Sequence, residues 1–343
     1  MHPALRAFLV FVAGCTVLCN PAAALDRTQL AVVINTRDPL SVAVGDYYAA
    51  KRSLSFQNII RVEFAPGGAT LTTQEFEPVR ASVERQARPS VQAYALTWAA
   101  PYRVDCMSIT AAFTFGFDPV FCAEGCKPTQ SSPLFNSAAR LPFTQLGMRP
   151  AMAIAARTLE DAKALIDRGV AADGSLPAGT AYLLSTTDAA RNVRHVLYPQ
   201  AAAVLRAHVR TRVLAQDALE HARDVLFYFT GRVRIEGLET LGFVPGAIAD
   251  HLTSAGGMLT DSGQMSALRW LEAGATGSYG TVVEPCNLLQ KFPHPAIVAA
   301  HYLRGETLIE AYWKSVMMPG QGIFIGEPLA APFARTRRAR DRR

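Results

Sequence analysis

Short apolar runs alternate with segments of helical spacing along most of this chain. The runs LAVVI at 30–34, AYLL at 181–184 and VLFYF at 225–229 are apolar throughout, as in strands that are covered on both faces. Helical spacing follows at 41–53, and Thr158 begins another helix with the pattern of a capping box. Strands that alternate with helices are typical of a parallel sheet. The pattern therefore predicts an α/β fold with a mostly parallel sheet and helices on both faces.

The first residues have the layout of an export signal. Arg6 precedes an uncharged apolar run, and three small alanines at 22–24 follow it. This three-part pattern predicts a signal peptide over residues 1–24, with cleavage after Ala24. A second processing pattern, Val-Ala-Gly before Cys15, is an alternative that would leave a lipid anchor on this cysteine. Either route predicts a periplasmic or secreted protein.

The chain after the signal is long enough for one large α/β domain. We expect a single domain over residues 25–333, and a Pro/Ala-rich junction at 149–157 leaves open a subdivision near residue 150. No later segment contains 18 uncharged apolar residues in a row. A membrane-spanning helix in the mature chain is therefore not expected.

The formal net charge of +6 arises at the two ends of the chain. Residues 335–343 carry six arginines and one aspartate, and Arg6 in the signal supplies one further positive charge. The body between them is neutral, whereas a nucleic-acid-binding domain carries basic residues on its folded surface. We therefore expect no nucleic-acid partner, and a disordered basic tail over residues 334–343.

Four cysteines follow the signal, and an even number in an exported chain favours disulfides. Cys122 and Cys126 lie four residues apart in FCAEGCKP, where a glycine and a proline favour a turn. This spacing predicts a Cys122–Cys126 pair, which leaves Cys106 and Cys286 as a long-range pair or as two buried thiols. The spacing is not CxxC and no histidine lies near it, so we expect no metal site.

Familiar catalytic and cofactor motifs are absent from the sequence. It contains no P-loop, no GxGxxG and no HExxH, so we expect no nucleotide or other cofactor. One candidate for chemistry is a Cys/His pair of Cys286 and His251, with Asp250 or Asp261 to orient the imidazole. Carboxylates beyond predicted strand ends, Asp261 and Glu284, are a second candidate for acid–base chemistry. The structural alternative makes His251 a partly buried helix residue and places Cys286 in a disulfide.

Several longer stretches carry a resemblance to known proteins. They include LAVVINTRDPLSVAVGDYYAAKRSLSFQNIIRV, YALTWAAPYRVDCMSIT, GTAYLLSTTDAARNVRH and the segment from VLFYFTG to GSYGTVVEP. Together they resemble a family of exported bacterial proteins of unknown function. That family in turn distantly resembles gingipain-type cysteine peptidases. The resemblance implies a caspase-like, three-layer α/β architecture.

The resemblance fails at the catalytic positions. The peptidases carry Gly-His-Gly after the strand that matches VLFYFTG, where this chain has Gly231-Arg232-Val233. Their nucleophilic cysteine would fall within residues 254–257, which contain no cysteine. The sequence therefore predicts a binding or scaffolding module without peptidase activity, whose partner is an extracytoplasmic protein or a small molecule. The alternative is a hydrolase with a rearranged Cys/His or carboxylate site.

Overall fold

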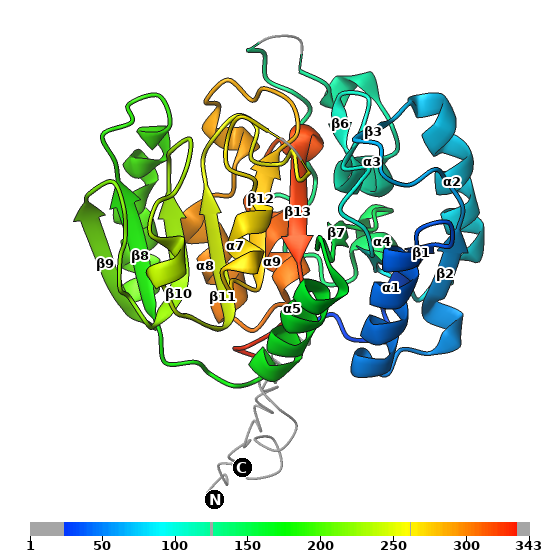
Figure 1. The fold of residues 1–343 in the computed structure, drawn as a ribbon, viewed down its shortest axis with the longest axis horizontal. Helices are drawn as coiled ribbons and strands as arrows, with labels where there is room; N and C mark the ends of the chain where they lie inside the picture. Colours follow the sequence, from blue (N-terminus) through cyan, green and yellow to red (C-terminus); the bar gives the residue numbers. More distant parts are fainter. Residues whose placement is uncertain (1–23, 124–125, 261, 335–343) are drawn as a thin grey trace, which may run out of the picture.

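The computed structural model of the protein describes residues 24–123, 126–260 and 262–334. A ten-stranded sheet with the order β2-β1-β4-β7-β13-β12-β11-β10-β8-β9 runs through its centre (Figure 1). β12 and β13 pair antiparallel, whereas the neighbouring strands within β2-β1-β4-β7 and within β12-β11-β10-β8-β9 pair parallel. Three short strands form a second sheet with the order β3-β5-β6. The predicted mostly parallel α/β fold is confirmed.

The strands are β1 (Leu30–Asn35), β2 (Ile59–Val62), β3 (Thr70–Leu71), β4 (Ala93–Leu96), β5 (Arg103–Val104), β6 (Met107–Ser108), β7 (Ala151–Ala153), β8 (Thr180–Ser185), β9 (Arg210–Ala215), β10 (Val225–Thr230), β11 (Phe243–His251), β12 (Gly277–Thr281) and β13 (Gly322–Gly326). The α-helices are α1 (Pro39–Arg52), α2 (Thr73–Gln86), α3 (Ile109–Phe115), α4 (Pro142–Leu146), α5 (Leu159–Ala172), α6 (Tyr198–Arg206), α7 (Leu268–Glu272), α8 (Pro295–Leu303) and α9 (Leu308–Ser315).

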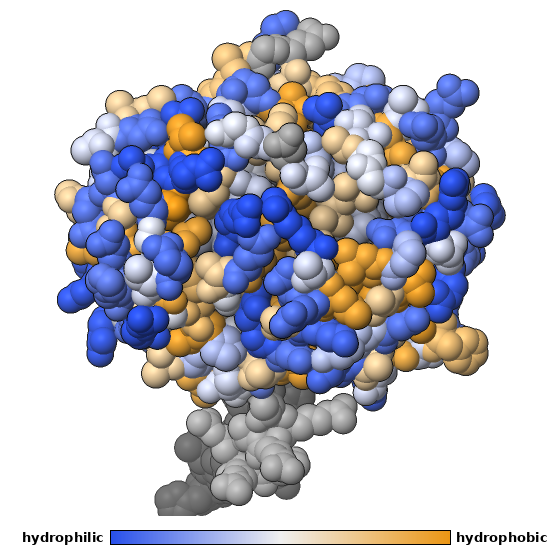
Figure 2. Space-filling model, viewed as in Figure 1, coloured by the Kyte–Doolittle hydropathy of each residue, from blue (hydrophilic) through white to orange (hydrophobic). Residues whose placement is uncertain are grey.

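Helices cover both faces of the large sheet. In Figure 1, α1, α5 and α7 lie in front of the strands, and α8 and α9 lie behind them. α1 packs against α5, and α8 packs against both α6 and α9. Hydrophilic residues are spread over the face that shows α1 and α5, with a smaller hydrophobic area among them (Figure 2). None of the helices within the described residues is both long and apolar enough to cross a membrane.

The apolar runs form the central strands because helices cover the sheet on both sides. All residues of β1 and β10 are buried, as expected for strands without a solvent-facing side. The predicted cap of α5 is present, since the Thr158 side chain accepts a hydrogen bond from the amide of Asp161 at 3.1 Å. The sequence did not predict α2, although Thr72 and Glu75 form a complete capping box at its start.

β11 was not predicted as a strand, because the structural alternative considered for His251 placed this residue in a helix. His251 is the last residue of this strand and does not belong to a helix. Pro245 and Gly246 interrupt the apolar pattern at the start of the strand, and Gly246 adopts a φ of +89°. The pairing register between β10 and β11 shifts in this region. A bulge at the start of a strand interrupts the regular alternation of side chains, so the sequence pattern does not predict the strand.

Two disulfides join Cys106 to Cys122 and Cys126 to Cys286, with Cα–Cα separations of 5.5 and 5.0 Å. The predicted Cys122–Cys126 pair is wrong, and so is the long-range Cys106–Cys286 pair. The expectation that these four cysteines are disulfide-bonded is confirmed. The spacing within FCAEGCKP did not predict the pairing, because both of its cysteines are bonded to partners outside this turn.

Packing around the β5–β6 hairpin explains the first pair. Cys106 lies in the turn between β5 and β6. The amide of Asp118 donates a hydrogen bond to the sulfur of Met107 in the same hairpin at 3.4 Å. This contact joins residue 118 to the hairpin that carries Cys106, to which Cys122 is bonded, whereas Cys126 is bonded to the distant Cys286.

Candidate functional site

His251 lies at the carboxyl end of β11, where the sequence placed one half of a Cys/His pair. Its side chain is buried, with 1% of the residue exposed. The indole N–H of Trp270 donates to Nδ1 at 2.9 Å, so Nε2 carries the proton and donates to the carbonyl of Met265 at 3.1 Å. Burial lowers the pKa of His251 to about 3. The imidazole is therefore neutral, and both of its nitrogens are engaged.

Cys286 and Glu284 lie in the segment that follows β12. Cys286 has no free thiol, because it is bonded to Cys126. Glu284 is exposed, and its Oε1 accepts a hydrogen bond from the amide of Cys286 at 2.8 Å, which is a local turn contact. Asp261 lies outside the described residues. The structure therefore does not assemble the dyad of His251 and Cys286.

Asp250, the other candidate to orient the imidazole, has a different partner. Its Oδ1 accepts a hydrogen bond from Nη1 of Arg194 at 2.5 Å, and both side chains are almost fully buried. Arg194 also donates to the carbonyl of Thr230 at 2.9 Å. It lies in a 3-10 helix, Asn192–Leu197, that follows β8. This ion pair ties the ends of β10 and β11 to the segment after β8.

Backbone packing fills the space around residues 254–257, which follow β11. The amide of Gly257 donates to the carbonyl of Thr281 at 2.8 Å, so this loop lies directly against β12. A Cβ atom on Gly280 would lie 2.3 Å from the carbonyl carbon of Gly256. Just after β10, Arg232 forms an ion pair with Asp217 at 2.6 Å. At the carboxyl edge of β10, β11 and β12, the backbone is therefore closely packed and the charged side chains form ion pairs.

A pocket of about 420 Å³ lies at the other edge, where β4 and β7 begin. α2, α3 and α4 supply its remaining walls. Its volume falls within the range of small-molecule sites. Its lining residues are Arg80, Glu84, Ala87, Pro89, Tyr94, Phe113, Thr114, Phe143, Gly147 and Arg149.

Arg149 is the most unusual residue of this pocket. Only 9% of it is exposed, and its Nε donates to the carbonyl of Val91 at 2.9 Å. Its guanidinium carbon lies 3.2 Å from the centre of the Phe143 ring, a stacked cation–π contact. No carboxylate among the described residues forms an ion pair with it. A nearly buried arginine is normally paired, because removing an uncompensated charge from water is costly.

Tyr94 adds a second group without a partner. The residue is 2% exposed, and its hydroxyl oxygen has no hydrogen-bond partner within the described part of the chain. Burial raises the pKa of Tyr94 to about 12, so the hydroxyl stays protonated and can donate. Nearby Arg80 is paired with Glu84 at 2.7 Å, which satisfies one nitrogen of that guanidinium. An unpaired guanidinium beside a free hydroxyl donor suits an anionic group.

Comparison with known proteins finds solved structures that match this chain at low sequence identity. No protein-family model and no curated protein matches the chain. The chain is similar to a solved structure described as "Structure of Protease", with a TM-score of 0.45 and 10% identity over 89% of this chain and 78% of that one. It is also similar to a complex of the pro- and mature domains of RgpB from Porphyromonas gingivalis, with a TM-score of 0.49 and 8% identity over 88% and 79% of the two chains.

The pocket residues were not predicted from the sequence. Tyr94 is the second residue of β4, and Arg149 precedes β7 more than fifty residues later, so no local motif joins them. One signal was present, because Arg149 stands in GMRPAM with no acidic residue beside it. Within the described residues, no group of three or more His, Cys, Asp or Glu side chains is arranged to hold a metal ion.

Proposed function

We propose that this protein is an exported binding module without peptidase activity, and that it binds a small anionic ligand in the Arg149 pocket. The unpaired guanidinium of Arg149 carries this proposal. An arginine held by one backbone carbonyl and one aromatic ring keeps its terminal nitrogens for a ligand. Carboxylate and phosphate groups match the planar donor array of a guanidinium.

The aromatic walls favour a ligand with an apolar part beside its anionic group. Phe113 and Phe143 line the pocket together with Tyr94. The hydroxyl of Tyr94 would then donate to the anion, or to a polar atom close to it. The large hydrophobic side chains that are exposed elsewhere, such as Phe56 and Leu176, lie in separate segments of the chain. Scattered exposure of this kind favours a small ligand over a large protein partner.

Export is supported by the two disulfides, since such bonds persist in oxidising compartments. The non-peptidase part is supported by Arg232 at the histidine position and by the packed glycines near Gly280. A hydrolase that uses Cys286 and His251 gains no support, because the first is in a disulfide and the second is neutral and fully hydrogen-bonded.

Thermal-shift and calorimetric titrations would test ligand binding with small probes: benzoate, phenylacetate, a linear alkanoate and inorganic phosphate. We expect at least one carboxylate to raise Tm in a saturable manner, because a ligand of the native state stabilises it by mass action. The Arg149→Met variant should lose this response. As a matched control, Arg269→Met removes an exposed arginine on α7 and should retain it.

Two outcomes would count against the proposal. The first is a set of titrations in which no probe binds in an Arg149-dependent manner. The second is cleavage of a random peptide mixture by the purified protein that persists after its Cys126–Cys286 bond is shown to be intact by mass spectrometry.

A further inference from the structure

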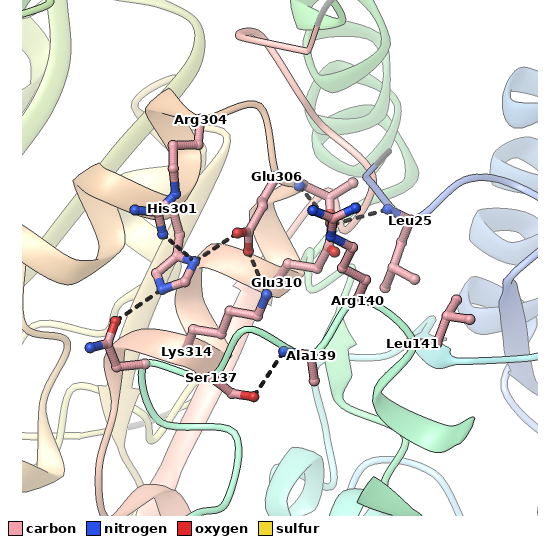
Figure 3. A network of polar contacts seen from close by, with 12 residues as sticks. Leu25, Ser137, Ala139, Arg140, Leu141, His301, Arg304, Glu306, Glu310 and Lys314 are labelled. Atoms are coloured by element: carbon pink, nitrogen blue, oxygen red, sulfur yellow. Dashed lines mark hydrogen bonds and ion pairs between the residues drawn. The ribbon is translucent and has the colours of Figure 1, made fainter. Parts of the chain in front are cut away.

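Glu310 on α9 is a buried carboxylate close to the start of the described chain. Its Oε2 accepts hydrogen bonds from the amide of Thr307 at 2.9 Å and from the hydroxyl of the same residue at 2.5 Å. The third donor is the backbone N–H of Leu25, at 3.1 Å (Figure 3). Only 4% of Glu310 and 4% of Leu25 are exposed. The backbone N–H of Leu25 is thus anchored on the carboxylate of a helix nearly three hundred residues away.

Two cations near Glu310 in the chain, His301 and Lys314, are engaged by another carboxylate. Glu306, one turn earlier, accepts from Nδ1 of His301 at 2.8 Å and from Nζ of Lys314 at 2.7 Å (Figure 3). Among the described residues, no lysine, arginine or histidine forms an ion pair with Glu310. Burial raises the pKa of this carboxyl, which reflects the lack of a compensating charge. A buried carboxylate without a compensating charge is stabilised when a cation pairs with it. The place for such a cation is beside Oε2, which accepts the hydrogen bond from Leu25.

The position of Leu25 supplies such a cation. It follows Ala24, the last residue of the predicted signal peptide. Hydrolysis of the Ala24–Leu25 bond adds the hydroxyl of water to the Ala24 carbonyl and a proton to the Leu25 nitrogen. The released amine takes up one further proton from solvent and becomes an α-ammonium, since its ordinary pKa is about 7.7–8.0.

We propose that Glu310 is the receptor for the mature N-terminus, and that the α-ammonium of Leu25 forms a buried ion pair with it after signal removal. The inference rests on cleavage after Ala24 and is independent of any ligand in the Arg149 pocket. In the precursor the same nitrogen is an uncharged amide, so the folded precursor lacks this ion pair. Signal removal therefore stabilises the fold as well as releasing the protein.

The same geometry separates the two processing routes. Cleavage before Cys15 would leave ten residues ahead of Leu25, and its nitrogen would remain an amide. The buried carboxylate would then have no cation. The Glu310 site thus favours a mature protein that begins at Leu25 over a lipid-anchored form.

The test is a double-mutant cycle on protein exported from a bacterial host with its own signal. Mass spectrometry first establishes the mature N-terminus, which we expect at Leu25. One change inserts Gly-Ser after Ala24, so that processing leaves Leu25 as an internal amide. The other change is Glu310→Gln. Each alone should lower Tm by about 2–4 °C, and the two together should lower it little further, because both remove the same ion pair.

Glu306→Gln is the matched control, since Glu306 lies on the same stretch of chain but has His301 and Lys314 as partners. Its effect should add to that of the Gly-Ser insertion. A second readout is the reactivity of the α-amine toward an amine-directed ester at pH 7. It should be at least about tenfold lower in the wild type than in Glu310→Gln, because the paired ammonium holds its proton. A mature N-terminus elsewhere, additive effects with Glu310→Gln, or equal reactivity in the two proteins would overturn the proposal.

Discussion

The two edges of the large sheet use charged and polar residues in opposite ways. At the carboxyl edge, Arg194 and Asp250 form a buried ion pair, and both nitrogens of His251 are hydrogen-bonded. At the amino edge, Arg149 is nearly buried without a carboxylate, and the Tyr94 hydroxyl has no partner. The carboxyl edge thus holds paired charges, whereas the amino edge holds a charged group without an ion-pair partner and a polar group without a hydrogen-bond partner among the described residues.

This contrast indicates that the carboxyl edge stabilises the fold and that the amino edge is the place for a ligand. Single atoms of the carboxyl-edge pair, Asp250 Oδ2 and Arg194 Nε, also lack partners, but the opposite charges of the two groups offset one another. Arg149 has no such compensation. Groups that evolution leaves unsatisfied tend to reduce stability in return for function. Stability measurements on the two edges should therefore differ in size and in sign.

The largest effect is expected from Arg194→Met, which leaves the Asp250 carboxylate buried without its cation. Breaking one side of a buried ion pair costs about 3–5 kcal/mol. Urea unfolding followed by circular dichroism would measure the loss. Arg232→Met is the control, because it breaks a partly exposed pair with Asp217 whose loss should cost at most about 1 kcal/mol. Equal losses in the two variants would mean that the Arg194 pair does not hold this edge together.

Acid should weaken the same edge through His251. Burial lowers its pKa to about 3, below an unfolded value of about 6.5, so below pH 6.5 the unfolded state binds the proton and the folded state does not. This contribution to stability is complete above pH 6.5 and is lost as pH falls toward 3. Between pH 7 and pH 4 the loss amounts to about 3 kcal/mol.

The pH effect can be assigned to His251 by comparison with a variant. His251→Gln retains a donor and an acceptor but does not titrate, so its stability should depend less steeply on pH over the same range. Urea midpoints measured at intervals between pH 7 and pH 4 give both slopes. Parallel slopes would show that other groups govern the acid sensitivity, and that His251 is not the buried neutral residue described above.

These differences also show which parts of the fold and of the candidate site can be predicted from the sequence. The strands at 30–35 and 225–230 were predictable because burial on both faces leaves an unbroken apolar run. The site was not, since Tyr94 and Arg149 meet only through the pairing of β4 with β7. Whether a charge is paired depends on tertiary neighbours, and spacing along the chain does not carry that information. The pairing of the cysteines was predicted wrongly for the same reason.

The smallest effect, and the one that separates the two edges most clearly, is expected from Arg149→Met. Methionine retains the apolar contact with Phe143 and removes a nearly buried charge that no described carboxylate balances. The lost hydrogen bond to the Val91 carbonyl costs about 1 kcal/mol, and relief of the desolvated charge offsets it. We therefore expect a change within about 0.5 kcal/mol of zero, or a gain, in the same urea experiment that finds Arg194→Met strongly destabilised. A loss as large as that of Arg194→Met would mean that Arg149 is a structural residue, and that the amino edge is as much a part of the frame as the carboxyl edge.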